Sequence, residues 1–159
     1  MSYSSTPHLE SLPWSVEGSI DRFFRNQESR LEIVGTSSPS VLGGLLSLHK
    51  VRWSDRPHLV IVPTPADASR LETALQFFDP TGGIFVLPPF DVSLYSGLYP
   101  NRRTVAQRLS WLWKASQAKP GQIFIAPIEA LAQKTLPFSV LHQGSFSLSK
   151  NDSLPDRLN

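Results

Sequence analysis

The chain contains no cysteine among its 159 residues. Disulfides and thiolate metal sites are therefore excluded, and this composition is typical of proteins from a reducing cytoplasm. We expect no metal site, because the four histidines (His8, His49, His58 and His142) lack the spacing of metal ligands. No apolar run approaches the ~20 residues of a membrane span, and the first residues do not resemble a signal peptide. We therefore expect a cytoplasmic protein that does not contact the membrane.

Strong charge is also lacking. The formal net charge is +2 and 18% of the residues are charged, which is too little to identify a nucleic-acid-binding protein. The hydrophobic share of 40% is ordinary for a globular protein, and the length suffices for one domain with a core.

Four short apolar runs organise the chain, and a turn and a helical pattern follow most of them. The runs are continuously apolar, as is typical of parallel strands buried on both faces. Thr64 followed by Pro65 is a good helix start after the second run. We predict an α/β fold, a three-layer α/β/α sandwich with a mainly parallel sheet and right-handed crossovers. The runs cover residues 31–34, 58–63, 83–88 and 122–127.

Composition divides the chain into three parts. Residues 1–14 are polar and proline-containing, and we expect a flexible lead-in. The α/β domain covers 15–137 and begins with a helical pattern over 15–26. Residues 138–150 are Ser-rich and indicate a half-exposed strand, which would open a small and truncated second domain over 138–159.

The turn after the first run is where a phosphate-binding loop would lie. In the frame that starts at Gly35, the motif Gly-x-x-x-x-Gly-Lys-Ser/Thr would need Gly, Lys and Ser/Thr at Ser40, Val41 and Leu42. Without the Lys and the magnesium ligand, the charge that develops in phosphoryl transfer is not compensated. No Asp-Glu pair that could hold the magnesium follows another apolar run. We therefore predict that this turn is a degenerate phosphate loop (P-loop), with no catalysis and no cofactor.

The pair Gly43-Gly44 lies inside the next helical pattern. We expect it to mark a close approach of this helix to the sheet.

A helix predicted over 101–114 follows an aromatic, proline-rich loop. Its predicted inward stripe contains Val105, Leu109, Leu112 and Trp113, while Arg103, Gln107, Trp111 and Lys114 are predicted to face away.

Two interpretations of this region stay open. Four aromatic or apolar residues of the loop could fold back as a self-packed cover, namely Phe90, Leu94, Tyr95 and Tyr99. Alternatively, Arg102, Arg103 and Trp111 could contact DNA or a protein partner, because two arginines at a helix N-terminus favour an anionic neighbour.

The order of these features resembles the N-terminal part of the bacterial transcription-repair coupling factor (Mfd) family, which is itself similar to the first domain of the excision-repair protein UvrB. The resemblance covers about residues 16–150 and is most specific over 87–136. It depends on Leu87-Pro88-Pro89-Phe90-Asp91, Tyr99-Pro100, Arg108-Leu109-Ser110-Trp111-Leu112 and Ile125-Ala126-Pro127-Ile128-Glu129-Ala130-Leu131.

The chain departs from UvrB in two ways. Its phosphate loop is degenerate, and only about fifteen residues separate Pro88 from Thr104, too few for the long DNA-clamping hairpin of UvrB. Both departures favour the coupling-factor family.

The resemblance implies a parent protein that is an ATP-driven DNA translocase, which displaces stalled RNA polymerase and recruits UvrA. This segment would have a P-loop NTPase or helicase-like fold with a degenerate P-loop. It would be a non-catalytic scaffold and autoinhibitory module with mainly intramolecular contacts. Two alternatives stay open. One is a nucleotide-binding excision-repair domain of the UvrB type, and the other is a stand-alone α/β domain with a ligand near Thr36–Ser40 and Pro63–Thr64.

Overall fold

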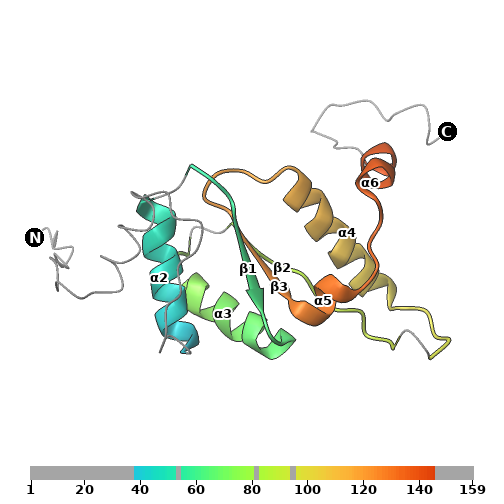
Figure 1. Ribbon diagram of the computed structural model, residues 1–159, viewed down its shortest axis with the longest axis horizontal. Coiled ribbons are helices and arrows are strands. Elements are labelled where there is room, and N and C mark those ends of the chain that lie inside the picture. The colour runs from blue at the N-terminus through green and yellow to red at the C-terminus, as the bar shows by residue number, and fades with distance from the viewer. Residues whose placement is uncertain (1–37, 53–54, 81–82, 94–95, 146–159) are drawn as a thin grey trace, which may run out of the picture.

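The computed structural model describes residues 38–52, 55–80, 83–93 and 96–145 (Figure 1). The helix expected over 15–26 and the strand expected over 31–34 lie outside these residues, as do 146–159. In chain order the elements are α2 (Pro39–Arg52), β1 (His58–Val62), α3 (Pro65–Phe78), β2 (Ile84–Val86), α4 (Arg102–Ser116), β3 (Ile123–Pro127), α5 (Ile128–Ala132) and α6 (Phe138–Gly144).

The three described strands form an open, all-parallel sheet in the order β1-β3-β2. Val60 of β1 and Val86 of β2 both pair with Ile125 in the central strand β3. The strands predicted over 58–63, 83–88 and 122–127 are therefore confirmed, and so is their parallel arrangement.

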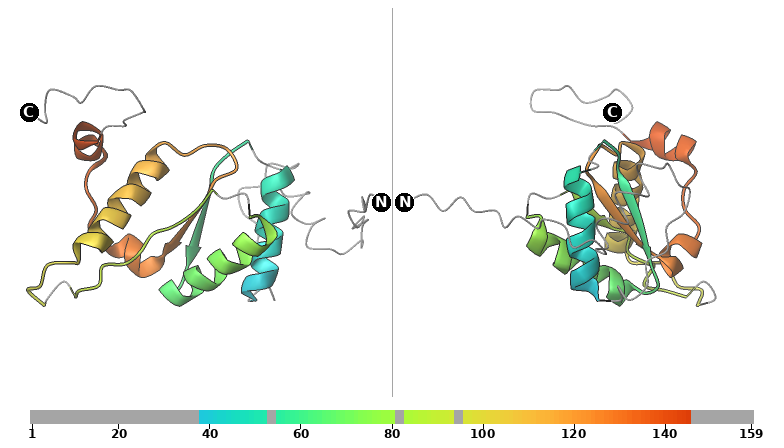
Figure 2. Two further views of the ribbon diagram at one scale, coloured as in Figure 1. Left: turned by 180° about the vertical axis from the view of Figure 1, so that it is seen from behind. Right: turned by 60° about the vertical axis from the view of Figure 1, so that its left-hand side comes forward.

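Helices lie on both faces of this sheet (Figures 1 and 2). On one face, Ile123 and Ile125 of β3 pack with Leu71 and Leu75 of α3, and Leu42 of α2 joins them. On the other face, the alternate residues of β3 pack with Trp111 of α4 and Ala130 of α5. All five residues of β3 are buried, as the continuous apolar run predicted.

Strand β1 differs from the central strand. Leu59 and Ile61 are 59% and 56% exposed, on the face that α4 covers only over β2 and β3. The prediction that every apolar run is buried on both faces is therefore wrong for β1. The reason is its position, since β1 is an edge of the described sheet and only its other side chains, Val60 and Val62, meet a helix layer.

Helix α3 begins where the sequence predicts. The Thr64 side chain accepts a hydrogen bond from the Asp67 N–H at 3.1 Å, and Pro65 occupies the first turn. This cap satisfies one of the N–H groups that have no partner within the helix.

The close approach at Gly43 is between two helices. A Cβ at Gly43 would lie 2.9 Å from the Cβ of Ala74 in α3, whereas one at Gly44 would meet only the Phe78 ring at 3.5 Å. The expectation that this pair packs against the sheet is therefore wrong. Glycine is needed at position 43 because α2 crosses α3 there with no room for a side chain.

The segment 138–144 is helical, so the half-exposed strand predicted to start at Phe138 is wrong for these residues. The Leu141 N–H donates to the Pro137 carbonyl and the Leu141 side chain is buried. Phe138 and Leu141 are three residues apart, a helical spacing that the intervening serine and valine obscure. The helix lies beside α4, where the His142 and Trp113 rings are 5.2 Å apart. Within the described ranges, no helix is long and apolar enough to cross a membrane.

Candidate functional site

The described part of the stretch compared above with a phosphate loop lies at the start of α2. Gly35 lies outside the described residues, and Ser40, Val41 and Leu42 all lie in the first turns of α2. Ser40 and Val41 are exposed, while Leu42 is half-buried against the core below the helix. The positions that would hold the phosphates therefore begin a helix that packs on the core, and none of the three side chains carries a charge.

Arg108 of α4 is the buried polar centre of the described structure. Its side chain is 2% exposed, and Nη1 donates to the Pro88 carbonyl at 2.6 Å while Nη2 donates to the Ala130 carbonyl at 3.1 Å. Nη1 also lies 3.2 Å from Oε1 of Gln133, which accepts the Phe90 N–H at 2.8 Å. The Phe90 ring lies against the guanidinium, with Cζ 4.2 Å from its centroid.

The partners of Arg108 are neutral oxygens. Burial lowers the pKa of Arg108, but an arginine pKa is high enough that the group keeps its proton in proteins. A buried charge is stable only when its donors are satisfied, and the planar guanidinium reaches several carbonyl oxygens at once. Arg108 therefore holds together the 87–91 turn, α4 and the α5 segment, which are distant in sequence.

We predicted no role for Arg108. The sequence carries one relevant signal, because Arg108 lies three and four residues from Val105, Trp111 and Leu112 and so falls on an otherwise apolar face. Gln133, which links Phe90 to Arg108, carries no such signal.

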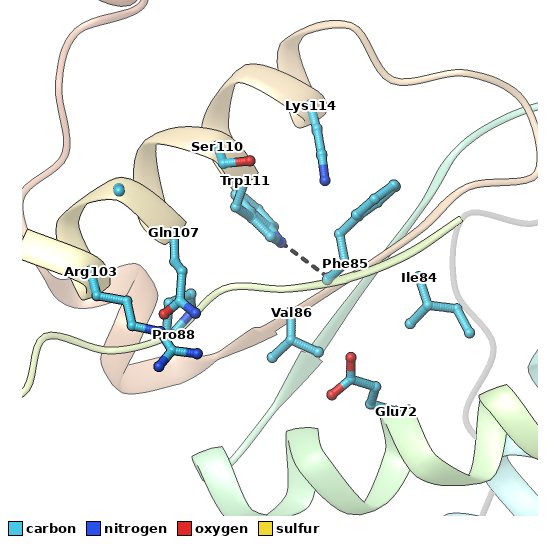
Figure 3. A pocket seen from close by; sticks show the side chains of 11 residues that line it. Glu72, Ile84, Phe85, Val86, Pro88, Arg103, Gln107, Ser110, Trp111 and Lys114 are labelled. Atoms are coloured by element: carbon cyan, nitrogen blue, oxygen red, sulfur yellow. Dashed lines mark hydrogen bonds between the residues drawn. The ribbon is translucent and has the colours of Figure 1, made fainter. Parts of the chain in front are cut away.

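Trp111 does not face away from the domain as predicted. It is 9% exposed, and its Nε1–H donates to the Phe85 carbonyl at 3.1 Å (Figure 3). Its ring meets that of Phe124 edge-on, with 5.5 Å between the ring centroids. The predicted stripe of Val105, Leu109, Leu112 and Trp113 is only half-buried. The inward face of α4 is rotated toward Arg108 and Trp111, because an arginine whose terminal nitrogens donate to buried oxygens can itself be buried. Trp111 therefore belongs to the core and does not share an exposed surface with Arg102 and Arg103.

Arg102 and Arg103 are exposed in the first turn of α4, as predicted. The Asn101 side chain caps this helix by accepting the Arg103 N–H at 2.9 Å. No acidic residue lies in this turn, so the helix end presents two cations where an anion would be favourable. The predicted trio is thus separated, with two arginines on the surface and the tryptophan inside.

The loop before α4 is closed at its base and exposed at its tip. The Asp91 carboxylate accepts the Asn101 N–H at 3.0 Å, which joins the two ends of the loop. Tyr99 is 95% exposed and Leu98 is also exposed. Of the four aromatic and apolar residues predicted to fold back, Phe90 packs on Arg108, Tyr99 does not pack, and Leu94 and Tyr95 lie outside the described residues.

No group of three or more His, Asp or Glu side chains in the described part of the chain could hold a metal ion. No protein-family model matches the chain, and a search of curated proteins likewise finds no match.

Proposed function

We propose that this chain is the non-catalytic, UvrB-like N-terminal module of a bacterial transcription-repair coupling factor. The parent protein would be an ATP-driven DNA translocase that releases stalled RNA polymerase and recruits UvrA. The module would act as a scaffold and an autoinhibitory interaction domain, with the fold of a helicase domain whose P-loop is degenerate.

One observation supports this proposal above the others. The segments that carry the resemblance, 87–91, 108–112 and 125–131, meet in space around the Arg108 guanidinium. Short motifs scattered along a sequence can match a family by chance. Motifs whose residues bond to one another are parts of one structural unit, which is what a shared fold requires.

The surroundings of Ser40, Val41 and Leu42 support an interaction role over hydrolysis. Leu42 packs into the apolar core below α2, and no cationic side chain replaces the missing lysine among these three positions. Phosphoryl transfer depends on such positive groups to stabilise the charge that develops on the phosphate.

The first experiment measures nucleotide binding by the 159-residue chain. Titration with ATP and magnesium in a calorimeter should give no saturable heat below about 1 mM ATP. Micromolar affinity would contradict the proposal and favour the nucleotide-binding UvrB-type alternative.

The second experiment tests the parent activity. We expect the full product of the native gene to release RNA polymerase stalled on DNA only when ATP is present. The Arg108→Ala substitution in that product should lower the stability of this module without abolishing ATP hydrolysis, because the motor would lie elsewhere. A full product with no ATPase activity would contradict the proposal and favour the stand-alone ligand-binding alternative.

A further inference from the structure

The short strand β2 has one bonded edge and one open edge. Gly83 accepts the Ile123 N–H, and the Leu87 N–H donates to the Ile125 carbonyl, so residues 83, 85 and 87 turn their main-chain groups toward β3. The N–H and C=O groups of Ile84 and Val86 therefore point away from β3. Among the described residues, no strand pairs with this edge.

A groove lies along this edge, between α3 and α4 (Figure 3). We call it the β2 groove. Its volume of about 640 Å³ is within the range of ligand-binding clefts. Ile84 and Val86 form its floor toward α3, and Phe85 and Trp111 form its floor toward α4. A chain that enters the groove would thus meet main-chain donors and acceptors and an apolar side chain on each side.

The α4 wall of the groove is positively charged. Arg103, Gln107, Ser110 and Lys114 line it at helical spacing, and Glu72 of α3 is the one acidic residue in the lining. Arg103 and Lys114 make no ion pair with the described residues, and Lys114 Nζ lies 4.5 Å from the centroid of the Phe85 ring. Lys114 follows Arg103 by eleven positions, which correspond to ~16 Å of helix. That is also the length of about five residues of extended chain.

We propose that the β2 groove binds an extended acidic peptide of a partner protein, which adds to β2 as a further strand. The peptide's main chain would bond to Ile84 and Val86, the general mode of strand addition at an open sheet edge. Side chains alternate along a strand, so every second residue would face α4 and should be Asp or Glu, opposite Arg103 and Lys114. The remaining residues would be apolar and would face Ile84 and Val86. This inference rests on the sheet edge and its charges and does not depend on the family proposed above.

The test uses a fluorescein-labelled peptide of four Glu-Val repeats and the full 159-residue chain, with binding followed by fluorescence anisotropy at low salt. We expect saturable binding, and we expect the exchange of the Ile84 and Val86 amide protons to slow when the peptide binds. The double substitution Arg103→Glu and Lys114→Glu should weaken binding at least about tenfold, because two attractive contacts become repulsive. The control is Arg102→Glu, which makes one such charge reversal at an exposed neighbour outside the groove and should alter the affinity less than about twofold.

Four results would overturn the proposal. The first is equal binding of a peptide with four Glu followed by four Val, which has the same charge without the alternation. The second is an equal loss of affinity in Arg102→Glu. The third is binding of oligothymidylate without binding of the Glu-Val peptide, which would make the groove a nucleic-acid site. The fourth is protection of the Ile84 and Val86 amides by a synthetic peptide of residues 29–36, which would make this chain its own occupant. Circular dichroism of each variant separates a binding defect from unfolding.

Discussion

At the scale of single residues, Arg108 is a buried cation that no described carboxylate neutralises. Its stability depends on hydrogen bonds to the Pro88 and Ala130 carbonyls and to Gln133. If the guanidinium is removed, these oxygens stay buried and lose their donor, which costs more than the net value of the bonds themselves.

We therefore expect Arg108→Ala to lower the free energy of unfolding by about 3 kcal/mol or more. Arg108→Lys should recover only part of this loss, because an ammonium group cannot reach three separated oxygens in one plane. Urea denaturation followed by circular dichroism measures both values. The control is Arg103→Ala, an exposed arginine on the same helix, which should change stability by less than about 0.5 kcal/mol. Equal losses of stability at the two positions would contradict the conclusion that Arg108 holds three segments of the fold together.

His58, at the start of β1, should make stability depend on pH. Burial lowers the pKa of His58, and this effect exceeds the opposing influences of Asp55 and of the Gln122 main chain. The folded protein thus binds the proton less well than the unfolded chain, whose histidine pKa is about 6.5. Below that pH the unfolded state takes up more protons, so stability is present above pH ~6.5 and falls as the pH decreases toward ~5.

The measurement is the melting temperature between pH ~5 and ~8, compared with that of His58→Gln, which should flatten the decrease. If the melting temperature of the wild-type protein rises as the pH falls, the direction given for the pKa of His58 is wrong.

At the scale of elements, the α2–α3 contact depends on a glycine, because there is no room for a side chain where the two helices meet. Gly43 lets α2 approach Ala74, and this contact keeps Leu42 and Leu46 of α2 on the core. A methyl group at position 43 must push the two helices apart, because a separation of 2.9 Å between Cβ atoms is shorter than van der Waals contact.

We expect Gly43→Ala to destabilise the protein by about 1–3 kcal/mol despite the better helix propensity of alanine. Gly44→Ala, one position along, should be neutral or stabilising by up to about 1 kcal/mol, since its Cβ would meet the Phe78 ring at an ordinary distance. Thermal denaturation of both variants and of Gly43→Ala with Ala74→Gly tests the contact. The double variant should regain part of the lost stability, and no regain would place the cause elsewhere.

At the scale of the whole molecule, the helix layers cover the sheet unevenly. Both faces of β3 are covered and β2 is half-buried, whereas β1 is covered on the α2–α3 face alone. Adjacent residues of β1 therefore lie in different surroundings, with Ile61 more than half exposed and Val62 buried.

This difference predicts opposite outcomes for one kind of substitution. Ile61→Thr should change the free energy of unfolding by less than about 0.5 kcal/mol, because its side chain already faces water. Val62→Thr preserves the shape but buries a hydroxyl group, and it should cost about 1–3 kcal/mol. Chemical denaturation of the two variants provides the measurement. A large loss at Ile61 would mean that its face is covered in solution.

The sequence predicts the periodic parts of this fold well. The runs at 58–63, 83–88 and 122–127 and the Thr64-Pro65 helix start depend on local patterns, and all of them are found. The errors occur where long-range contacts decide the outcome. Burial of Arg108 depends on carbonyls twenty or more residues away, and the exposure of Leu59 and Ile61 depends on which strand lies at the edge. Neither fact is encoded in the spacing of neighbouring residues.

The candidate contact surface was predictable only in part for the same reason. Arg102 and Arg103 are exposed because charged side chains in the first turn of a helix face water, a local property. Trp111 looked similar to them by spacing, but its indole N–H finds the Phe85 carbonyl on β2, which only the tertiary structure reveals.

The buried arginine also has a consequence for the order of folding. Its three oxygen partners come from the 87–91 turn and the 130–133 segment, so the guanidinium must stay hydrated until both segments have reached α4. An early intermediate that buried it without those oxygens would carry an unsatisfied charge. The Arg108 bonds should therefore form after the transition state, and Arg108→Lys should speed unfolding while leaving the refolding rate nearly unchanged.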